Sequence, residues 1–273
     1  MRTFTRLCAA AAVALVVAGC ANPMADHGSM GASPSAADHR GMEMATGDGL
    51  AASADGFRLA IGKTAGPLTF QILGTNGKPV TSFEVDQTKR MHFYLVRSDL
   101  TGFQHVHPEM AADGTWTANL ATAAPGSYRA YASFLSAGKA LVLSQPVSVP
   151  GKASAMVLPP PTTTTTVDGY TLTVDSPSLL AGMSHPLTVS VAREGKPVTD
   201  LQPYLDTYAH LTAFHAGDQA FAHLHPEGSV QGDHGGPKLT FVAMLPKSGD
   251  WRLFVQFQTG GRLRTAAITL RVR

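Results

Sequence analysis

The chain carries one stretch of sequence twice, and this internal repeat limits its possible folds more than any other feature. Residues 77–109 match residues 195–227 without a gap, at a constant spacing of 118 residues. Both copies begin with Gly-Lys-Pro-Val-Thr and end with His-x-His-Pro-Glu. A gapless match of this length is hard to obtain by chance, so the sequence predicts two copies of one domain.

Each copy consists of short β-forming runs separated by turn residues such as Asn76-Gly77, which predicts an all-β fold. No stretch shows sustained helical periodicity. Because each copy has about a hundred residues, we expect two tandem immunoglobulin-like β-sandwich domains. In the first copy the expected strands are residues 57–61, 68–73, 91–96, 128–135 and 141–143.

The two copies differ in length near their ends. Residues 126–129 align with residues 249–252, where the spacing has grown from 118 to 123 residues. We expect the five extra residues in the loop formed by residues 228–237, which contains glycines and His234.

Composition divides the chain into five segments. A stretch almost free of large aliphatic residues cannot bury enough apolar surface to become ordered, which predicts a disordered tether. A Pro- and Thr-rich linker is semi-rigid and should space two independent domains rather than fuse them. The expected boundaries are residues 1–19 for a signal peptide, 20–54 for the tether, 55–150 for the first domain, 151–166 for the linker and 167–273 for the second domain.

The N-terminus indicates a lipoprotein. Arg2 and Arg6 precede an apolar run that is too short to span a bilayer, and Val17-Ala18-Gly19-Cys20 is similar to a bacterial lipobox. We expect Cys20 to carry acyl chains, palmitate among them, that anchor the mature chain at the extracytoplasmic face of the cell membrane. Cys8 would leave with the signal, so no cysteine remains for disulfides or thiolate ligands. A plain secretory signal is the alternative.

The tether contains thioether and imidazole side chains, a combination that suits copper, especially Cu(I). A low-complexity leader without chemical purpose is the alternative interpretation. The candidate ligands are Met24, His27, Met30, His39, Met42 and Met44.

A histidine trio occurs at the same positions in both domains. In a strand, residues two apart point to one face, so each His-x-His sets two imidazoles side by side. Pro108 and Pro226 follow these pairs and lack the amide hydrogen that a sheet needs, so each pair should lie at a strand end. The trios are His92, His105 and His107, and His210, His223 and His225.

The sequence of the second domain also predicts how the three histidines of its trio are arranged. Gly217-Asp218 suits a two-residue hairpin turn, which would place His210 opposite His225 and His223 opposite Thr212. The same register turns His215 to the other face of the hairpin. By the constant spacing, the first domain should place His92 opposite His107, and His105 opposite Tyr94.

Each trio predicts a metal site. Cross-strand Cβ atoms lie about 4.5–5.5 Å apart, close enough for imidazoles to share an ion, and three of them leave a coordination position open. We expect one ion per domain, with Glu109 and Glu227 orienting the ligands and His234 as a possible fourth ligand in the second. Nitrogen ligands admit copper and zinc, and the Met-containing tether favours copper. Imidazole binds metal when neutral, so the metal should be lost below about pH 6. Hydrogen-bonded histidine pairs without metal are the alternative.

The lipobox, His92, the His-x-His-Pro-Glu motif and the Gly-Ser-Tyr-Arg or Gly-Asp-Trp-Arg strand entry together carry a resemblance to a known group. The chain resembles bacterial extracytoplasmic β-sandwich domains of the YtkA-like and FixH-like type and, more loosely, copper-resistance proteins of the CopC kind. The resemblance implies a β-sandwich outside the cytoplasm. CopC-like proteins bind copper partly through an N-terminal histidine, and Cys20 stands at that position here.

These observations favour a membrane-anchored metal-binding protein, with copper expected, that acts as a carrier, buffer or delivery factor. Its partners would be the membrane and a copper transporter or cuproenzyme of the envelope. An immunoglobulin-like interaction module without metal is the alternative. A metalloenzyme that uses the open coordination position is the third and weakest alternative. We expect no enzyme, because no carboxylate, Lys or Tyr is clearly placed as an acid or base. With a formal charge of +2 and no basic stripe, we expect no nucleic-acid partner.

Overall fold

Every regular element in the described part of the chain is a β-strand. The computed structural model describes residues 47–64, 67–176 and 178–273 and, of His225, the backbone alone. No helix in these ranges is long and apolar enough to cross a membrane. The strands of the first repeat are β1 (Ser53–Ala54), β2 (Phe57–Ile61), β3 (Leu68–Leu73), β4 (His92–Arg97), β5 (Gln104–Val106), β6 (Glu109–Met110), β7 (Trp116–Ala118), β8 (Gly126–Ser136) and β9 (Lys139–Val149). Those of the second repeat are β10 (Thr164–Val167), β11 (Tyr170–Asp175), β12 (Ser184–Arg193), β13 (Lys196–Pro197), β14 (Ala209–His215), β15 (Phe221–Pro226), β16 (Lys238–Met244), β17 (Gly249–Thr259) and β18 (Arg262–Val272).

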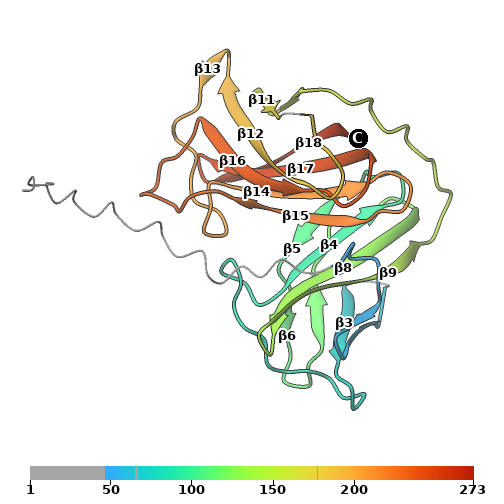
Figure 1. Ribbon diagram of the computed structural model, residues 1–273. Coiled ribbons are helices and arrows are strands. Elements are labelled where there is room, and N and C mark those ends of the chain that lie inside the picture. The colour runs from blue at the N-terminus through green and yellow to red at the C-terminus, as the bar shows by residue number, and fades with distance from the viewer. Residues whose placement is uncertain (1–46, 65–66, 177) are drawn as a thin grey trace, which may run out of the picture. The chain divides into compact units, whose positions relative to one another are not determined.

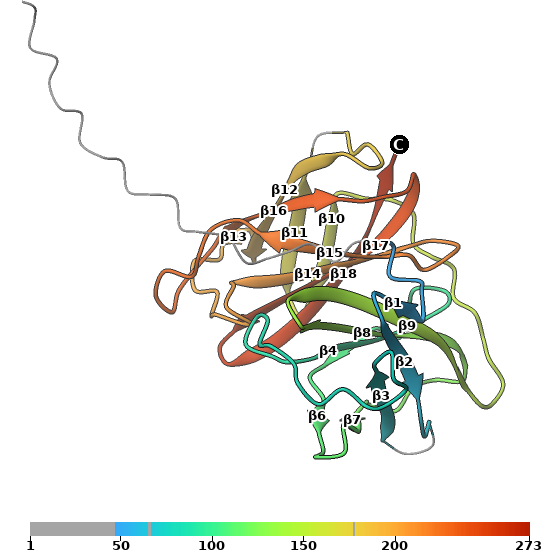
Figure 2. The ribbon, with the colours of Figure 1, turned by 60° about the horizontal axis from the view of Figure 1, so that its bottom comes forward.

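The first repeat is a two-layer β-sandwich, as predicted. One sheet has the strand order β1-β2-β3-β7-β6 and the other the order β5-β4-β8-β9 (Figures 1 and 2). Burial alternates along β3, so every second side chain enters the core between the sheets. There Phe70 of β3 stacks on Phe93 of β4 with ring centroids 4.7 Å apart, and on Trp116 at 6.2 Å. Such pairs add about 0.5–1.5 kcal/mol each beyond the area that they bury.

The second repeat is a sandwich of the same kind, except that one strand joins its two sheets. The strand order is β10-β11-β12-β16-β15-β14-β17-β18, with β13 paired to β12 (Figure 1). Strand β15 pairs with β14 up to Leu224 and then with β16 at His225 and Pro226. In the first repeat, residues 104–110 contain β5 and then β6, which pair with different sheets. In both repeats the chain therefore changes sheets at the second histidine and its proline.

The predicted strands and register are largely confirmed. Strands β2 and β3 have the predicted bounds, and Thr212 faces His223 as Tyr94 faces His105. The predicted pairs His210–His225 and His92–His107 are wrong. The ladders end at Leu211–Leu224 and Phe93–Val106 because the chain then crosses to the other sheet, where His225 pairs with Val242.

The predicted two-residue turn is wrong: β14 and β15 are joined through residues 216–220, with Gln219 at a φ of +62°. The register is unaffected because the His215 amide donates to the Ala220 carbonyl, which leaves four residues, 216–219, centred on Gly217 and Asp218. The loop between β15 and β16, residues 227–237, is where the extra residues were expected.

A third hydrophobic cluster contains residues of both repeats, which differs from the expectation of spaced domains. Its stacked pair is Phe103 of the first repeat and Phe254 of the second, with ring centroids 4.1 Å apart. Leu158 of the expected linker packs against the cluster. The linker is also shorter than expected, because β10 begins at Thr164. The buried members are Tyr94, Val96, Leu100, Tyr131, Phe214, Phe221 and Phe254.

Candidate metal centre

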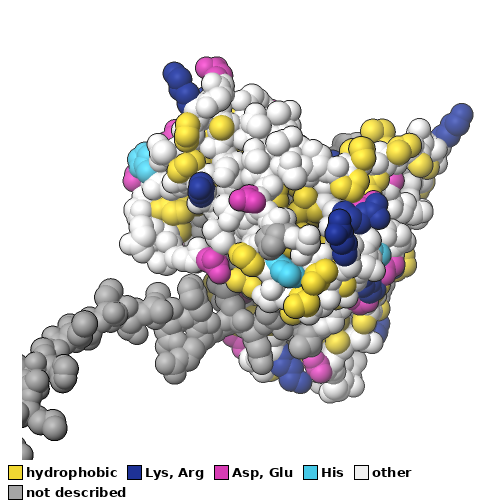
Figure 3. Space-filling view, turned by 45° about the horizontal axis from the view of Figure 1, so that its top comes forward, with side chains coloured by type: hydrophobic (Ala, Val, Ile, Leu, Met, Phe, Trp, Pro, Cys, Tyr) yellow, Lys and Arg dark blue, Asp and Glu magenta, His cyan; other side chains and the backbone are white. Residues whose placement is uncertain are grey.

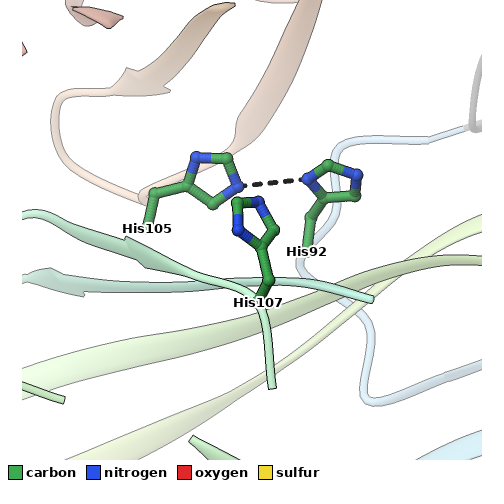
Figure 4. A group of neighbouring side chains, drawn as sticks. All are labelled: His92, His105 and His107. Atoms are coloured by element: carbon green, nitrogen blue, oxygen red, sulfur yellow. Dashed lines mark hydrogen bonds between the residues drawn. The ribbon is translucent and has the colours of Figure 1, made fainter. Parts of the chain in front are cut away.

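The first histidine trio comes together where β4 begins and β5 ends. His92 is the first residue of β4, His105 lies in β5 and His107 follows it (Figure 4). One nitrogen from each ring lies within 4.8 Å of the others. Nδ1 of His92 and Nε2 of His105 lie 3.2 Å apart. Two ligand nitrogens about 2.05 Å from one ion at a tetrahedral angle lie about 3.3 Å apart, so this pair has the spacing of a shared ion.

A strained turn sets the tautomer of His92. The turn pairs Asp86 with Lys89, and its central residues Gln87 and Thr88 have φ values of +45° and +68°. Non-glycine residues in this region cost roughly 1–3 kcal/mol each, so the surrounding structure must hold them. The turn brings the Asp86 carbonyl oxygen to 3.1 Å from Nε2 of His92. A carbonyl only accepts, so Nε2 carries the proton and Nδ1 directs its lone pair at His105.

His105 is held by a residue of the second repeat. Its Nδ1 lies 2.7 Å from Oε1 of Gln256 in β17, and the amide nitrogen of Gln256 lies 3.5 Å from the Thr265 hydroxyl. In this orientation the amide oxygen accepts the Nδ1 proton, which leaves a lone pair on Nε2 of His105. The lone pairs of His92 and His105 then face each other at 3.2 Å, an arrangement that a cation between them stabilises.

Burial keeps these histidines neutral. His92 is 2% exposed, and burial lowers its pKa. Burial, followed by the neighbouring His92 and His107, lowers the pKa of His105 well below its usual value. Burial lowers the pKa of His107 to about 3, and Nε2 of His107 is buried without a hydrogen-bond partner in the described part of the chain. A metal ion binds neutral imidazoles through their lone pairs. Because the pKa values are lowered, protons should compete with a metal for these nitrogens only below the pH of about 6 that the sequence predicted.

The second trio lies beside the first. His210 is 1% exposed, and its ring lies 4.8 Å from that of His105 and 4.6 Å from that of His223. Its Nε2 lies 3.1 Å from the hydroxyl of Tyr94 in the first repeat. Burial, followed by His223 and His105, lowers the pKa of His210 well below its usual value. The backbone of His225 pairs with Val242, and its side chain lies outside the described residues, so this trio is described only in part.

The other predicted site residues lie in different surroundings. His234 is exposed and hydrogen-bonds to Asp233, and Glu227 lines the same surface groove. Glu109 is exposed in β6, and among the described side chains no hydrogen bond joins either glutamate to His92, His105, His107 or His210. His215 is turned away as predicted, since its ring nitrogens contact Asp218 and the Ser248 carbonyl. The tether candidates and Cys20 lie outside the described residues.

Sequence reasoning missed two residues that hold the centre from outside. Asp86 gives no signal, because it acts through its backbone carbonyl. Gln256 gives a weak one: it is a lone amide within the otherwise apolar residues 253–257, and it is 3% exposed. A buried polar side chain in an apolar strand must find a partner, which points to a tertiary contact.

A cavity of about 700 Å³ reaches the edge of this cluster. Asp86 and His223 are among its lining residues, together with apolar side chains such as Leu141, Phe221 and Met244. On the face drawn in Figure 3, charged side chains of both signs are interspersed with apolar and uncharged ones. The cavity therefore borders the cluster at Asp86 and His223.

Fold and site together define a tandem β-sandwich protein with a histidine cluster where its repeats meet. Residues 45–151 and 165–273 each match the family described as "Domain of unknown function (DUF8832)". The chain belongs to this family and contains its domain twice. No curated protein matches the chain. The resemblance to YtkA-like, FixH-like and CopC-like domains stays a prediction.

Several solved structures are similar to this chain at low TM-scores. S-layer protein SbsC domains 4 and 5 are 12% identical over 81% of this chain and 95% of theirs, with a TM-score of 0.24. The two fibronectin type-III domain segment from chicken tenascin is 12% identical over 78% and 97%, with a TM-score of 0.22. Salmonella alpha-2-macroglobulin reacted with methylamine is 13% identical over 80% of this chain, which spans 16% of that one, with a TM-score of 0.23. All three TM-scores lie below 0.5, so no conclusion about this chain rests on these similarities.

Proposed function

We propose that the chain binds a metal ion, copper before zinc, at His92, His105 and His107, and that it acts as a carrier, buffer or delivery factor. The observation that supports this most is the pair of lone pairs facing each other 3.2 Å apart, each backed by an oxygen acceptor on the far side of its ring. Outer acceptors of this kind fix the tautomers of metal-binding histidines. Three imidazoles leave a position through which a partner's ligand can take over the ion.

The sequence alone supports the choice of copper over zinc and the proposed location of the protein. The lipobox at Cys20 supports a lipid-anchored protein on the extracytoplasmic face of the membrane. The methionines and histidines of the tether add ligands that suit Cu(I). A copper transporter or cuproenzyme of the envelope would then be the exchange partner.

Metal content and binding stoichiometry test this function. The purified protein should bind copper or zinc, and the double variant His105→Ala/His107→Ala should lose the ion of the first repeat, about half of the total if each repeat holds one. His215→Ala is the matched control, because this histidine contacts Asp218 and Ser248 rather than the trio. Circular dichroism checks that each variant keeps its fold. A double variant that retains all its metal, or a wild type that binds none, would overturn the proposal.

The interaction module is the second candidate. Val242 and Met244 project from one face of β16 and are 36% and 42% exposed, so an apolar surface is available to a protein partner. A wild type that binds no metal would favour this candidate.

A further inference from the structure

A continuous row of polar groups runs through the candidate metal centre into the second repeat. It links the Asp86 carbonyl to His92 at 3.1 Å, His92 to His105 at 3.2 Å, and His105 to Gln256 at 2.7 Å. It ends at the Thr265 hydroxyl, 3.5 Å from the Gln256 amide nitrogen. The carbonyl at one end can only accept hydrogen bonds, whereas the hydroxyl at the other end can donate or accept.

Without metal, the hydrogen bonds of this row must run in one direction. The Asp86 carbonyl requires the His92 proton on Nε2, so the His92 Nδ1 lone pair needs a donor. His105 supplies it when its proton is on Nε2, and Nδ1 of His105 then needs a donor in turn. The Gln256 amide nitrogen supplies that donor if the amide group is turned over, and its oxygen then accepts from the Thr265 hydroxyl.

With metal, the direction beyond His92 reverses. Both facing nitrogens give their lone pairs to the ion, so the His105 proton must lie on Nδ1. The Gln256 oxygen accepts this proton and its amide nitrogen donates to Thr265, which is the orientation found in the structure. Each histidine keeps one proton in both states. The His105 proton changes ring nitrogen by exchange with water.

We propose that Gln256 is a positioning residue whose amide turns over when the metal binds, so that the second repeat selects the tautomer of a ligand in the first. This rests on the proposed metal site at His92, His105 and His107. An amide suits the role because it presents a donor and an acceptor from one planar group. The centre is fully assembled only when β17 of the second repeat is docked against β5 of the first.

Ring-nitrogen NMR tests the tautomer directly, with zinc as a diamagnetic probe. The ¹⁵N shifts of His105 should show the proton on Nε2 in the metal-free wild type and on Nδ1 after zinc is added. In metal-free Gln256→Glu, whose carboxylate only accepts, the proton should already be on Nδ1. The same tautomer in all three samples would overturn the proposal.

Zinc affinity at pH 8 provides the second readout. Gln256→Met keeps the shape of the side chain but removes the acceptor, and should weaken binding by about 10–100-fold, as the loss of an outer acceptor does elsewhere. Gln256→Glu should bind at least as tightly as wild type. Gln219→Met is the matched control: its side-chain amide also joins the repeats, donating to the Val96 and Arg97 carbonyls, and these bonds involve none of the three proposed ligands. Its zinc affinity should be unchanged.

The two readouts separate the failures. A wild type that binds neither copper nor zinc would end the proposed function. The metal-free tautomers would still show whether residue 256 selects the protonated ring nitrogen of His105. Zinc binding with equal affinity in wild type, Gln256→Met and Gln256→Glu would overturn the role of Gln256 and leave the metal site standing.

Discussion

The two repeats build the same turn before the first histidine of each trio, yet they hold that histidine differently. In the first repeat, the turn at Gln87 and Thr88 gives its carbonyl to His92. In the second, Leu205 and Asp206 occupy the corresponding positions with φ values of +56° and +58°. His210, however, is held by a tyrosine of the first repeat. The duplicated sequence gives both repeats the same turn. The hydrogen-bond partner of the histidine that follows depends on the contacts between the repeats.

Residues that differ between the repeats make the junction asymmetric. Tyr94, which reaches His210, corresponds to Thr212 at the spacing of 118 residues. Gln256, which reaches His105, corresponds to Ser133 at the spacing of 123 residues, and these two face His210 and His92 in their own sheets. Each repeat therefore supplies one side chain, Tyr94 or Gln256, that contacts a histidine of the other repeat. The corresponding residues, Thr212 and Ser133, have shorter side chains.

The largest expected effect is on stability against acid, and it should come mainly from the first repeat. The folded pKa values of His92, His105, His107 and His210 are lowered from 6.5, so below pH 6.5 the unfolded chain binds more protons than the folded one. The free energy of unfolding should therefore fall as pH decreases from 6.5 towards 3, by up to about 1.4 kcal/mol per histidine and pH unit.

Urea unfolding with a chelator present, at several pH values, measures this slope. The slope reports how many more protons the unfolded chain binds than the folded one. His105→Gln/His107→Gln should lower this number by about two, and His210→Gln by about one. A free energy of unfolding that is the same at pH 7 and pH 5 would contradict the burial of neutral histidines.

Corresponding positions should respond with opposite signs in the two repeats. Tyr94→Phe leaves Nε2 of His210 buried without its hydroxyl partner, which should destabilise the protein by about 1–3 kcal/mol. The Thr212 hydroxyl is buried without a hydrogen-bond partner among the described residues, so Thr212→Val should stabilise by up to about 1 kcal/mol. Urea unfolding compares both variants with wild type, and equal destabilisation would show that the repeats are equivalent here.

The smallest expected effect follows cleavage between the repeats. Met156 and Val157 are 62% and 91% exposed, which makes this part of the linker accessible to a protease. Because the third cluster buries aromatic side chains from both repeats, the two fragments should remain associated. Size-exclusion chromatography should give one unchanged peak that contains two bands on a denaturing gel. Separate fragment peaks would support independent domains.

The sequence predicted the strand register within each repeat well, but it gave little information on the contacts between the repeats. One turn and one spacing predicted that Tyr94 faces His105 and Thr212 faces His223, because strand register has a period of two and leaves few alternatives. The contact of Gln256 with His105 joins residues far apart in the chain and depends on how the sandwiches dock. A signal for docking was present in the sequence: residues 93–96 are apolar at four consecutive positions, so both faces of this strand must be covered. The structure buries all six positions of β4.

The reciprocal contacts across the junction also bear on how this protein could be taken apart. Tandem domains are often treated as modules that can be deleted, transplanted or multiplied one at a time. Here a single copy would expose its half of the aromatic cluster and would leave either His105 without Gln256 or His210 without Tyr94. The smallest portable unit is therefore the pair, and a chimaera that joins one copy to an unrelated β-sandwich should not inherit the intact centre.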